Sequence, residues 1–299
     1  MTLSLAWIRT LNNIQELVFA SDSRLRAGQA WDCCPKILTL PRSDCLISFA
    51  GETDYAYPLM LQMARAIDFY PVSSDRKADI NAVKNHSLRV FNQMRDLIHD
   101  FPLPQTSADD PRTGFIFGGY SWRRQQFQIW KLIYRRQTDN FGFYEMPNWR
   151  GQAGIKVIAF AGDNIRDAHD RLISLLRERG KLEEGSFNME PFEVLRDMIR
   201  SNEYPTIGGA PQVAKVYRYL QTQYFTVKWP TGQGEPYALG RPALDYEHFG
   251  APAIDPDAPE IQSPWQTRIV SHKAPTDDSL VDIDDQEVDD EEPLIGDIP

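Results

Sequence analysis

The chain has 299 residues, of which 42% are hydrophobic and 25% are charged, enough for one large domain with or without appendages. No apolar run approaches the roughly 20 residues that cross a bilayer, and the first residues lack the basic and apolar regions of a signal peptide, so we expect a cytoplasmic protein without a membrane partner. The net charge of −10 is confined to residues 271–299, which hold eleven acidic residues and one lysine, so the rest of the chain lacks the basic excess of a nucleic-acid-binding protein.

Hydrophobic periodicity predicts strands and helices in separate groups along the chain. The first group has four strands, at Leu3–Arg9, Leu17–Arg24, Lys36–Leu40 and Cys45–Ala50. Helical spacing then predicts helices over Asp54–Phe69 and Ile80–His99. Strands return at Thr113–Gly119, Gln126–Arg135, Phe141–Glu145 and Lys156–Ala161. Two more helices, from Asp163 or Asn164 through about Arg179 and over Glu190–Arg200, precede late strands at Pro211–Tyr219 and Tyr224–Trp229.

This order favours an α+β class over alternating βα units. Two antiparallel sheets packed face to face, each covered outside by a helix pair, would bury the apolar faces of all these elements. We therefore predict one domain over residues 2–229. Residues 230–270 are rich in Pro and Gly and are expected to form an irregular extension. Residues 271–299 are acidic, lack aromatic side chains and are expected to be a disordered tail.

Side chains that bind metals or form disulfides follow no recognisable pattern. The odd number of cysteines and the lack of a C-x-x-C pair argue against a disulfide framework and a zinc site. The cysteines are Cys33, Cys34 and Cys45, and the scattered histidines are His86, His99, His169, His248 and His272. We expect no metal and no cofactor.

Four of the first 51 residues fit one mechanism. Thr2 would become the N-terminus if Met1 were removed, and its free α-amine, with a pKa of roughly 7.7–8.0, can take the proton from its own hydroxyl. A positive charge from Lys36 would oppose protonation of that amine, and Asp22 can be the counter-ion that a buried lysine needs. A backbone N–H at Gly51 can stabilise a tetrahedral intermediate, because glycine lets the backbone approach a ligand closely.

The order of these residues follows a known pattern, which has an N-terminal threonine, an "AADSR…G" strand, a "KI" strand start and a "FAG" turn into the first helix. The matching segments are Met1-Thr2, Phe19-Ala20-Ser21-Asp22-Ser23-Arg24 with Gly28, Lys36-Ile37 and Phe49-Ala50-Gly51. In this the chain resembles the proteasome β-subunit-like family of N-terminal nucleophile hydrolases, which includes bacterial proteasome-type proteases. Two glycine turns, Gly118-Gly119-Tyr120 and Ile207-Gly208-Gly209, extend the resemblance to about Trp229.

The resemblance implies a four-layer αββα sandwich and assigns roles to residues. Thr2 is then the nucleophile, Lys36 tunes its amine, Asp22 orients Lys36, and the amide of Gly51 is the oxyanion donor. Phe49 falls where family members line the pocket for the residue before the cleaved bond. Such domains act on peptides or unfolded proteins inside closed chambers. We therefore expect a threonine-type peptidase in a homo-oligomer, with an ATP-dependent unfoldase or another protein as its partner.

Two segments depart from the family pattern. The family usually has a serine at the start of the third helix, and an Asp and a Ser before the late glycine pair. The matching stretches here are Ala161-Gly162-Asp163 and Tyr204-Pro205-Thr206-Ile207, in which Asp163 and Thr206 are the candidate substitutes. The missing serines keep two alternatives open. One is a catalytically inactive structural or interaction protein with the same fold, and the other is an N-terminal nucleophile amidase that acts on a small amide.

Overall fold

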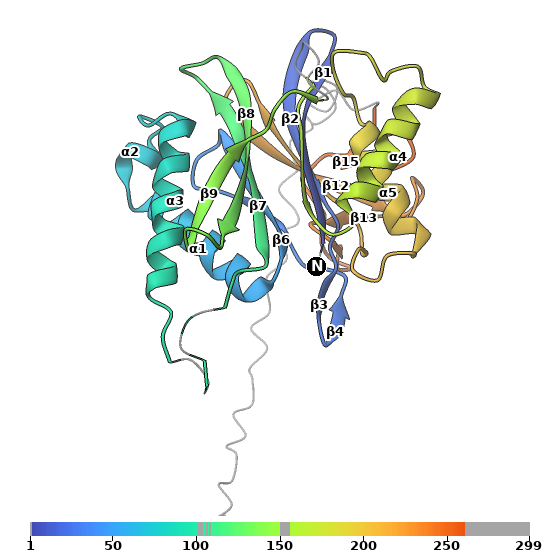
Figure 1. Cartoon of the computed structure of the whole chain (residues 1–299). Coiled ribbons are helices and arrows are strands. Elements are labelled where there is room, and N and C mark those ends of the chain that lie inside the picture. Colours follow the sequence, from blue (N-terminus) through green and yellow to red (C-terminus); the bar gives the residue numbers. More distant parts are fainter. Residues whose placement is uncertain (1, 101–103, 106, 108, 150–155, 261–299) are drawn as a thin grey trace, which may run out of the picture. The chain divides into compact units, whose positions relative to one another are not determined.

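The computed structural model describes residues 2–100, 104, 105, 107, 109–149 and 156–260 (Figure 1). Residues 1–262 belong to one unit by their contacts. The predicted acidic tail at residues 271–299 and the initiator Met1 lie outside the described residues. No helix of the described part is long and apolar enough to cross a membrane.

The larger sheet is built around the first hairpin of the chain. Its first two strands pair antiparallel across Asn12 and Asn13, whose φ values of 48° and 64° suit the tight turn that the sequence predicts there. The strand order is β10-β1-β2-β11-β12-β13-β14, with β15 paired to β12. The strands are β1 (Leu3–Leu11), β2 (Ile14–Ser21), β10 (Ile158–Gly162), β11 (Gln212–Tyr217), β12 (Gln221–Trp229), β13 (Glu235–Ala238), β14 (Arg241–Pro242) and β15 (Ala253–Ile254).

The second sheet has five antiparallel strands in the order β5-β6-β7-β8-β9. They are β5 (Ile37–Thr39), β6 (Cys45–Gly51), β7 (Thr113–Ser121), β8 (Gln126–Arg135) and β9 (Asn140–Glu145). All five correspond to predicted strands. A separate ribbon of β3 (Leu25–Ala27) and β4 (Gln29–Trp31) was not predicted, because its residues are mostly exposed and follow no apolar alternation.

Helices cover one face of each sheet (Figure 1). α1 (Thr53–Asp68) and α3 (Ile80–Asp96) share a buried apolar cluster with the five-stranded sheet, and α4 (Ile165–Glu178) and α5 (Glu190–Ser201) share another with the eight-stranded sheet. The short α2 (Pro71–Ser74) follows α1. A third cluster takes side chains from both sheets. The four long helices confirm the predicted ones, and the predicted α+β class is confirmed with them.

Part of the segment after Trp229 is regular, and the expectation of an irregular extension over residues 230–270 is wrong for that part. β13 adds to the edge of β12 and turns into β14, while β15 pairs parallel to β12. Ile254 of β15 is 1% exposed and joins the apolar cluster beneath α4 and α5. The sequence concealed these strands because they are short and separated by Pro and Gly.

Truncating Ile254 tests whether this segment stabilises the domain. Ile254→Ala is expected to lower the free energy of unfolding by about 2–5 kcal/mol, because it removes buried apolar volume and leaves a cavity. The control is Leu244→Ala in the same segment, where the side chain is 51% exposed and the expected change is within about 0.5 kcal/mol. Urea denaturation measures both. Equal losses for the two variants would show that the segment does not support the core.

Candidate active site

Thr2 immediately precedes β1, where the chain lies beside the end of β10. Its carbonyl accepts a hydrogen bond from the Asp163 amide at 2.8 Å, and its side chain is fully buried in the chain as described. Gly162, opposite Leu3, has a φ of +114°, and a Cβ there would lie 1.7 Å from the Thr2 carbonyl oxygen. Only glycine allows this approach, so Gly162 helps to fix the position of Thr2.

Lys36 connects Thr2 to a carboxylate. It directly precedes β5 and is fully buried, and its Nζ donates a hydrogen bond to Thr2 Oγ1. The same Nζ donates to Asp22 Oδ1 at 2.8 Å and to the Arg24 carbonyl at 2.5 Å. Burial lowers the pKa of Lys36, and the nearby Asp22 opposes that shift. The three N–H donors of the ammonium group are therefore all used, on the Thr2 hydroxyl, the Asp22 carboxylate and the Arg24 carbonyl.

Asp22 follows directly after β2 and is held by four donors. Its Oδ1 accepts from the Leu3 amide at 3.1 Å as well as from Lys36 Nζ, and its Oδ2 accepts from the amides of Arg24 and Gly208 at 3.1 and 3.0 Å. The carboxylate is fully buried and forms an ion pair with Lys36. A carboxylate fixed in this way keeps the lysine aimed at Thr2, which is the orienting role that the resemblance implies for it.

Gln212 is a positioning residue that the sequence did not reveal. It begins β11, is fully buried, and accepts a hydrogen bond from the Lys36 amide through Oε1 at 2.9 Å. Its Nε2 donates to Ser23 Oγ at 2.9 Å and to the Cys34 carbonyl at 2.6 Å. The side chain thus joins the segments that carry Asp22 and Lys36. The only local signal was a polar residue at the start of a mainly apolar strand, which also contains Lys215.

Replacing Gln212 tests this positioning role. Gln212→Leu is expected to lower the turnover number about tenfold and the free energy of unfolding by about 1–3 kcal/mol, because three buried partners lose their hydrogen bonds. Gln212→Glu keeps the acceptor for the Lys36 amide, so it should retain more turnover than the leucine variant. Gln223→Leu on β12 is the control, since among the described residues the Gln223 side-chain amide donates only to the Tyr224 carbonyl, at 2.8 Å. Turnover unchanged in Gln212→Leu would contradict the role.

Gly51 and Phe49, on β6, lie near Thr2 but do not bond to its side chain in the described residues. The Phe49 carbonyl accepts a hydrogen bond from Ser4 Oγ at 2.8 Å. Between Phe49 and Gly51, Ala50 packs close to Gly162 beside Thr2, since its Cβ lies 3.0 Å from the position of a Cβ built on Gly162. Gly51 has a φ of +120°, which favours glycine. The Phe49 ring is fully buried beneath α1, edge-on to Tyr57, so in this state it presents no surface to a substrate.

The two candidate substitutes for the missing serines have different surroundings. Asp163 reaches Thr2 through its backbone amide, while its side chain makes no hydrogen bond to Thr2 in the described part of the chain. Thr206 lies in the turn before Gly208, whose amide binds Asp22, and has no hydrogen bond to Thr2 among the described residues. Within the described part, Thr2 accepts a hydrogen bond from Lys36 Nζ at its hydroxyl and one from the Asp163 amide at its carbonyl.

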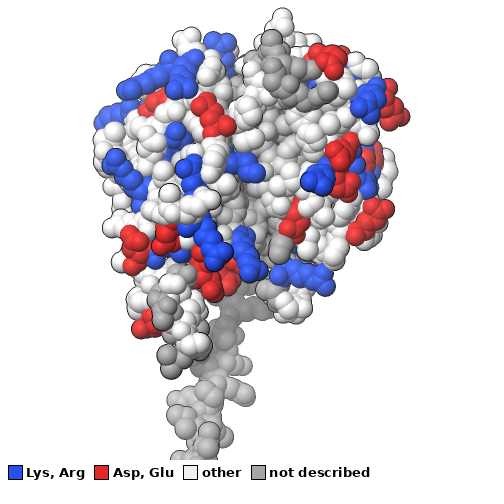
Figure 2. Space-filling model, in the orientation of Figure 1, with Lys and Arg blue, Asp and Glu red and all other residues white. Residues whose placement is uncertain are grey.

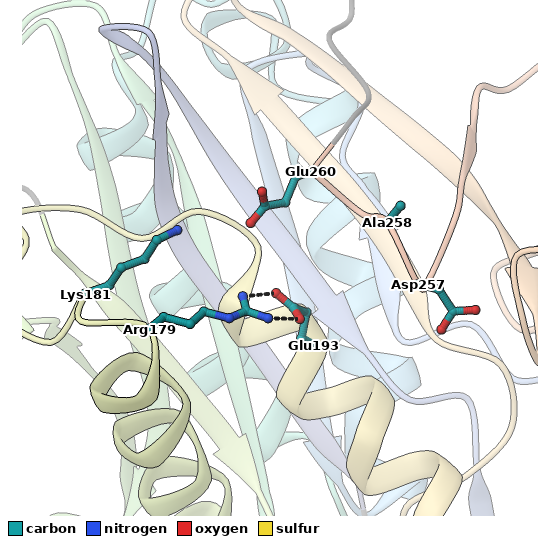
Figure 3. Close-up of a pocket in the computed structure, with 6 residues that line it drawn as sticks. All are labelled: Arg179, Lys181, Glu193, Asp257, Ala258 and Glu260. Atoms are coloured by element: carbon teal, nitrogen blue, oxygen red, sulfur yellow. Dashed lines mark hydrogen bonds and ion pairs between the residues drawn. The ribbon is translucent and has the colours of Figure 1, made fainter.

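A pocket of about 380 Å³ lies away from Thr2 and is unlike an active site (Figure 3). Arg179 donates to both carboxylate oxygens of Glu193 at 2.7 Å, and Lys181 pairs with Glu190 at 3.0 Å. We interpret the pocket as an ion-pair seam between the two helices and the C-terminal part of the domain. It is lined by Arg179, Lys181, Glu193, Asp257, Ala258 and Glu260.

Comparison with known proteins adds no family assignment. A scan against protein-family profiles finds no match to the chain, and a search of curated proteins finds none either. The described residues also contain no group of three or more His, Cys, Asp or Glu side chains that could hold a metal ion. The geometry around Thr2 is therefore the feature that points to a function.

Proposed function

We propose that the chain is a threonine-type N-terminal nucleophile hydrolase of the proteasome β-subunit-like family, which cleaves peptide bonds after Met1 is removed. The observation that carries the proposal is the buried contact of Lys36 Nζ with Thr2 Oγ1 and Asp22. Thr2, Asp22 and Lys36 come from separate segments of the chain, and the lysine ammonium group joins the other two just before the first strand. A lysine that merely neutralised Asp22 would not need to donate to Thr2 as well.

The arrangement suits a two-step hydrolysis. Thr2 Oγ1 attacks the substrate carbonyl, and the free α-amine of Thr2 takes the hydroxyl proton directly or through a water. The Lys36 ammonium stabilises the developing negative charge on Oγ1, and the Gly51 amide donates to the carbonyl oxygen as it becomes an oxyanion. Collapse of this intermediate expels the amine product, which takes the proton from the α-amine. Water then attacks the ester on Thr2 and restores the free hydroxyl while releasing the acid.

The fold supports the same proposal. A helix pair on the outer face of each sheet, with an apolar cluster between the sheets, fits the four-layer αββα sandwich of N-terminal nucleophile hydrolases. We extend the proposal to a homo-oligomer that encloses the site and receives unfolded substrates from a partner protein. Exposed apolar side chains at the α1–α2 junction, Phe69, Tyr70 and Val72, are the kind of surface that such contacts would cover.

Peptide hydrolysis by the purified protein tests the proposal. We expect turnover of fluorogenic peptides, inhibition by a peptide boronate that bonds to the threonine hydroxyl, and an intact mass that lacks Met1. Light scattering during size exclusion should give several times the 34.3 kDa of one chain. A preparation in which Met1 is fully absent but which cleaves neither peptides nor unfolded proteins would refute peptide hydrolysis and favour the inactive alternative.

A further inference from the structure

The strand β8 has one face toward α1 and α3 and the other toward the eight-stranded sheet. Trp130 and Leu132 belong to the cluster beneath those helices, whereas Phe127 and Ile129 belong to the cluster between the sheets. Because side chains alternate along a strand, Lys131, Ile133 and Arg135 continue the second face. This face of β8 is directed toward the eight-stranded sheet, whose strand β1 follows Thr2.

Lys131 is half-buried and has no ionic partner. No hydrogen bond or ion pair joins its Nζ to any other residue in the part of the chain that the structure describes. Burial lowers the pKa of Lys131, and no carboxylate opposes that shift. Lysines are seldom buried unless paired, because desolvating an unpaired charge is costly. Among the described residues, no carboxylate pairs with this cation.

Arg135 lies two positions beyond Ile133 on the same face and, like Lys131, has no ionic partner among the described residues. Its Nε is buried without a hydrogen-bond partner, and its guanidinium stacks on the Tyr144 ring with a centroid distance of 4.2 Å. Its polar contact is an Nη2 at 3.5 Å from the Phe143 carbonyl, and it pairs with no carboxylate in the described residues. The next residue, Arg136, lies in the turn after β8 and pairs with Asp110 at 3.1 Å.

Strand register relates these cations to Thr2. Ala50, which approaches Gly162 beside the Thr2 carbonyl, is opposite Gly114, and Gly114 is opposite Ile133. Lys131 is thus two strands and two residues from Ala50. With strands about 4.8 Å apart and about 3.4 Å per residue, its Cα lies about 12 Å from that of Ala50. An extended peptide covers that distance in about four residues.

We propose that Lys131 and Arg135 form a subsite for a substrate carboxylate, so that the enzyme prefers peptides with Asp or Glu within about four residues of the cleaved bond. This inference rests on the proposed function and adds a substrate class to it. Figure 2 shows Lys and Arg side chains on the left half of the face drawn, with Asp and Glu side chains among them. The substrate carboxylate would replace the missing ion pair.

Paired peptides that differ only by Glu or Gln at one position test the subsite. For the wild-type protein, kcat/KM should be about tenfold to a hundredfold higher for the Glu peptide at the responsive position, the range for a hydrogen bond to a charged group. In Lys131→Met this ratio should fall to about one, in Lys131→Arg it should persist, and in Lys131→Glu it should reverse toward a Lys peptide. Arg135→Met should lower the ratio partly. Thermal midpoints check that each variant folds.

Arg136→Met is the matched control, because Arg136 follows Arg135 directly, in the turn after β8, but already has a partner. Its Glu-to-Gln ratio should equal that of the wild type. Cleavage of both peptides at equal rates by the wild type overturns the subsite and leaves peptide hydrolysis standing. A preference that survives in both Lys131→Met and Arg135→Met assigns it to other residues and also overturns the subsite. If the wild type cleaves neither peptide at any position, the proposed function and the subsite fail together.

Discussion

Thr2→Ala is expected to abolish peptide hydrolysis, with a loss of at least about a thousandfold in turnover, because no other hydroxyl contacts Lys36 Nζ in the described residues. Thr2→Ser should retain part of the activity, since it keeps both the hydroxyl and the α-amine. Both variants leave a small residue after Met1 and so preserve its removal. Peptide turnover under saturating substrate, with intact mass recorded for each preparation, measures the effect.

The control for this pair is Thr138→Ala, in an exposed turn between β8 and β9, which should turn over like the wild type. Unfolding midpoints should show that Thr2→Ala folds, because the backbone carbonyl that binds the Asp163 amide remains. Residual activity in Thr2→Ala comparable to that of Thr2→Ser would remove Thr2 from the mechanism and leave the hydrolase proposal without its nucleophile.

Removing Lys36 should have the second-largest effect. Lys36→Met is expected to lower turnover at least about a hundredfold, since the Thr2 hydroxyl loses its charged donor. It should also cost about 3–5 kcal/mol of unfolding free energy, because Asp22 becomes a buried charge without a counter-ion. Chemical denaturation and peptide turnover measured on the same preparations separate these two losses.

A double variant, Lys36→Met with Asp22→Asn, distinguishes catalysis from folding. Replacing both members of a buried ion pair is often nearly neutral, so much of the stability should return while turnover stays low. Recovery of turnover along with stability would reduce Lys36 to a structural role. The wild type should also lose activity toward high pH at a lower value than an exposed lysine would give, because burial lowers the Lys36 pKa and the ammonium form is the one required.

The sequence predicted the residues of the candidate site that lie near the start of the chain. Thr2, Asp22 and Lys36 lie within the first 36 residues, and their order together with the family resemblance predicted that they act together. In the structure Lys36 Nζ donates to both Thr2 and Asp22. Gln212 was not predictable in this way, since its contact with the Lys36 amide depends on β11 pairing with β2 across more than half the chain.

The same limit applies to the rest of the domain. Alternating apolar residues predicted the long strands and helices because each buries one face against a partner. β13 and β15 were not predicted, because they pair with β12 through backbone hydrogen bonds along short stretches that have no apolar repeat. Alternation also assigns Lys131 to a face of β8. That no carboxylate of the described residues pairs with it depends on the fold and could not be predicted.

Peptide mapping by mass spectrometry after treatment with a threonine-directed epoxyketone tests whether Thr2 is the nucleophile. We expect one adduct, on a chain that begins at Thr2, and no adduct on Thr2→Ala. Because the amine must be free for the mechanism to run, molecules that retain Met1 should remain unlabelled. An adduct on another residue, or equal labelling of the wild type and Thr2→Ala, would contradict the assignment of Thr2 as the nucleophile.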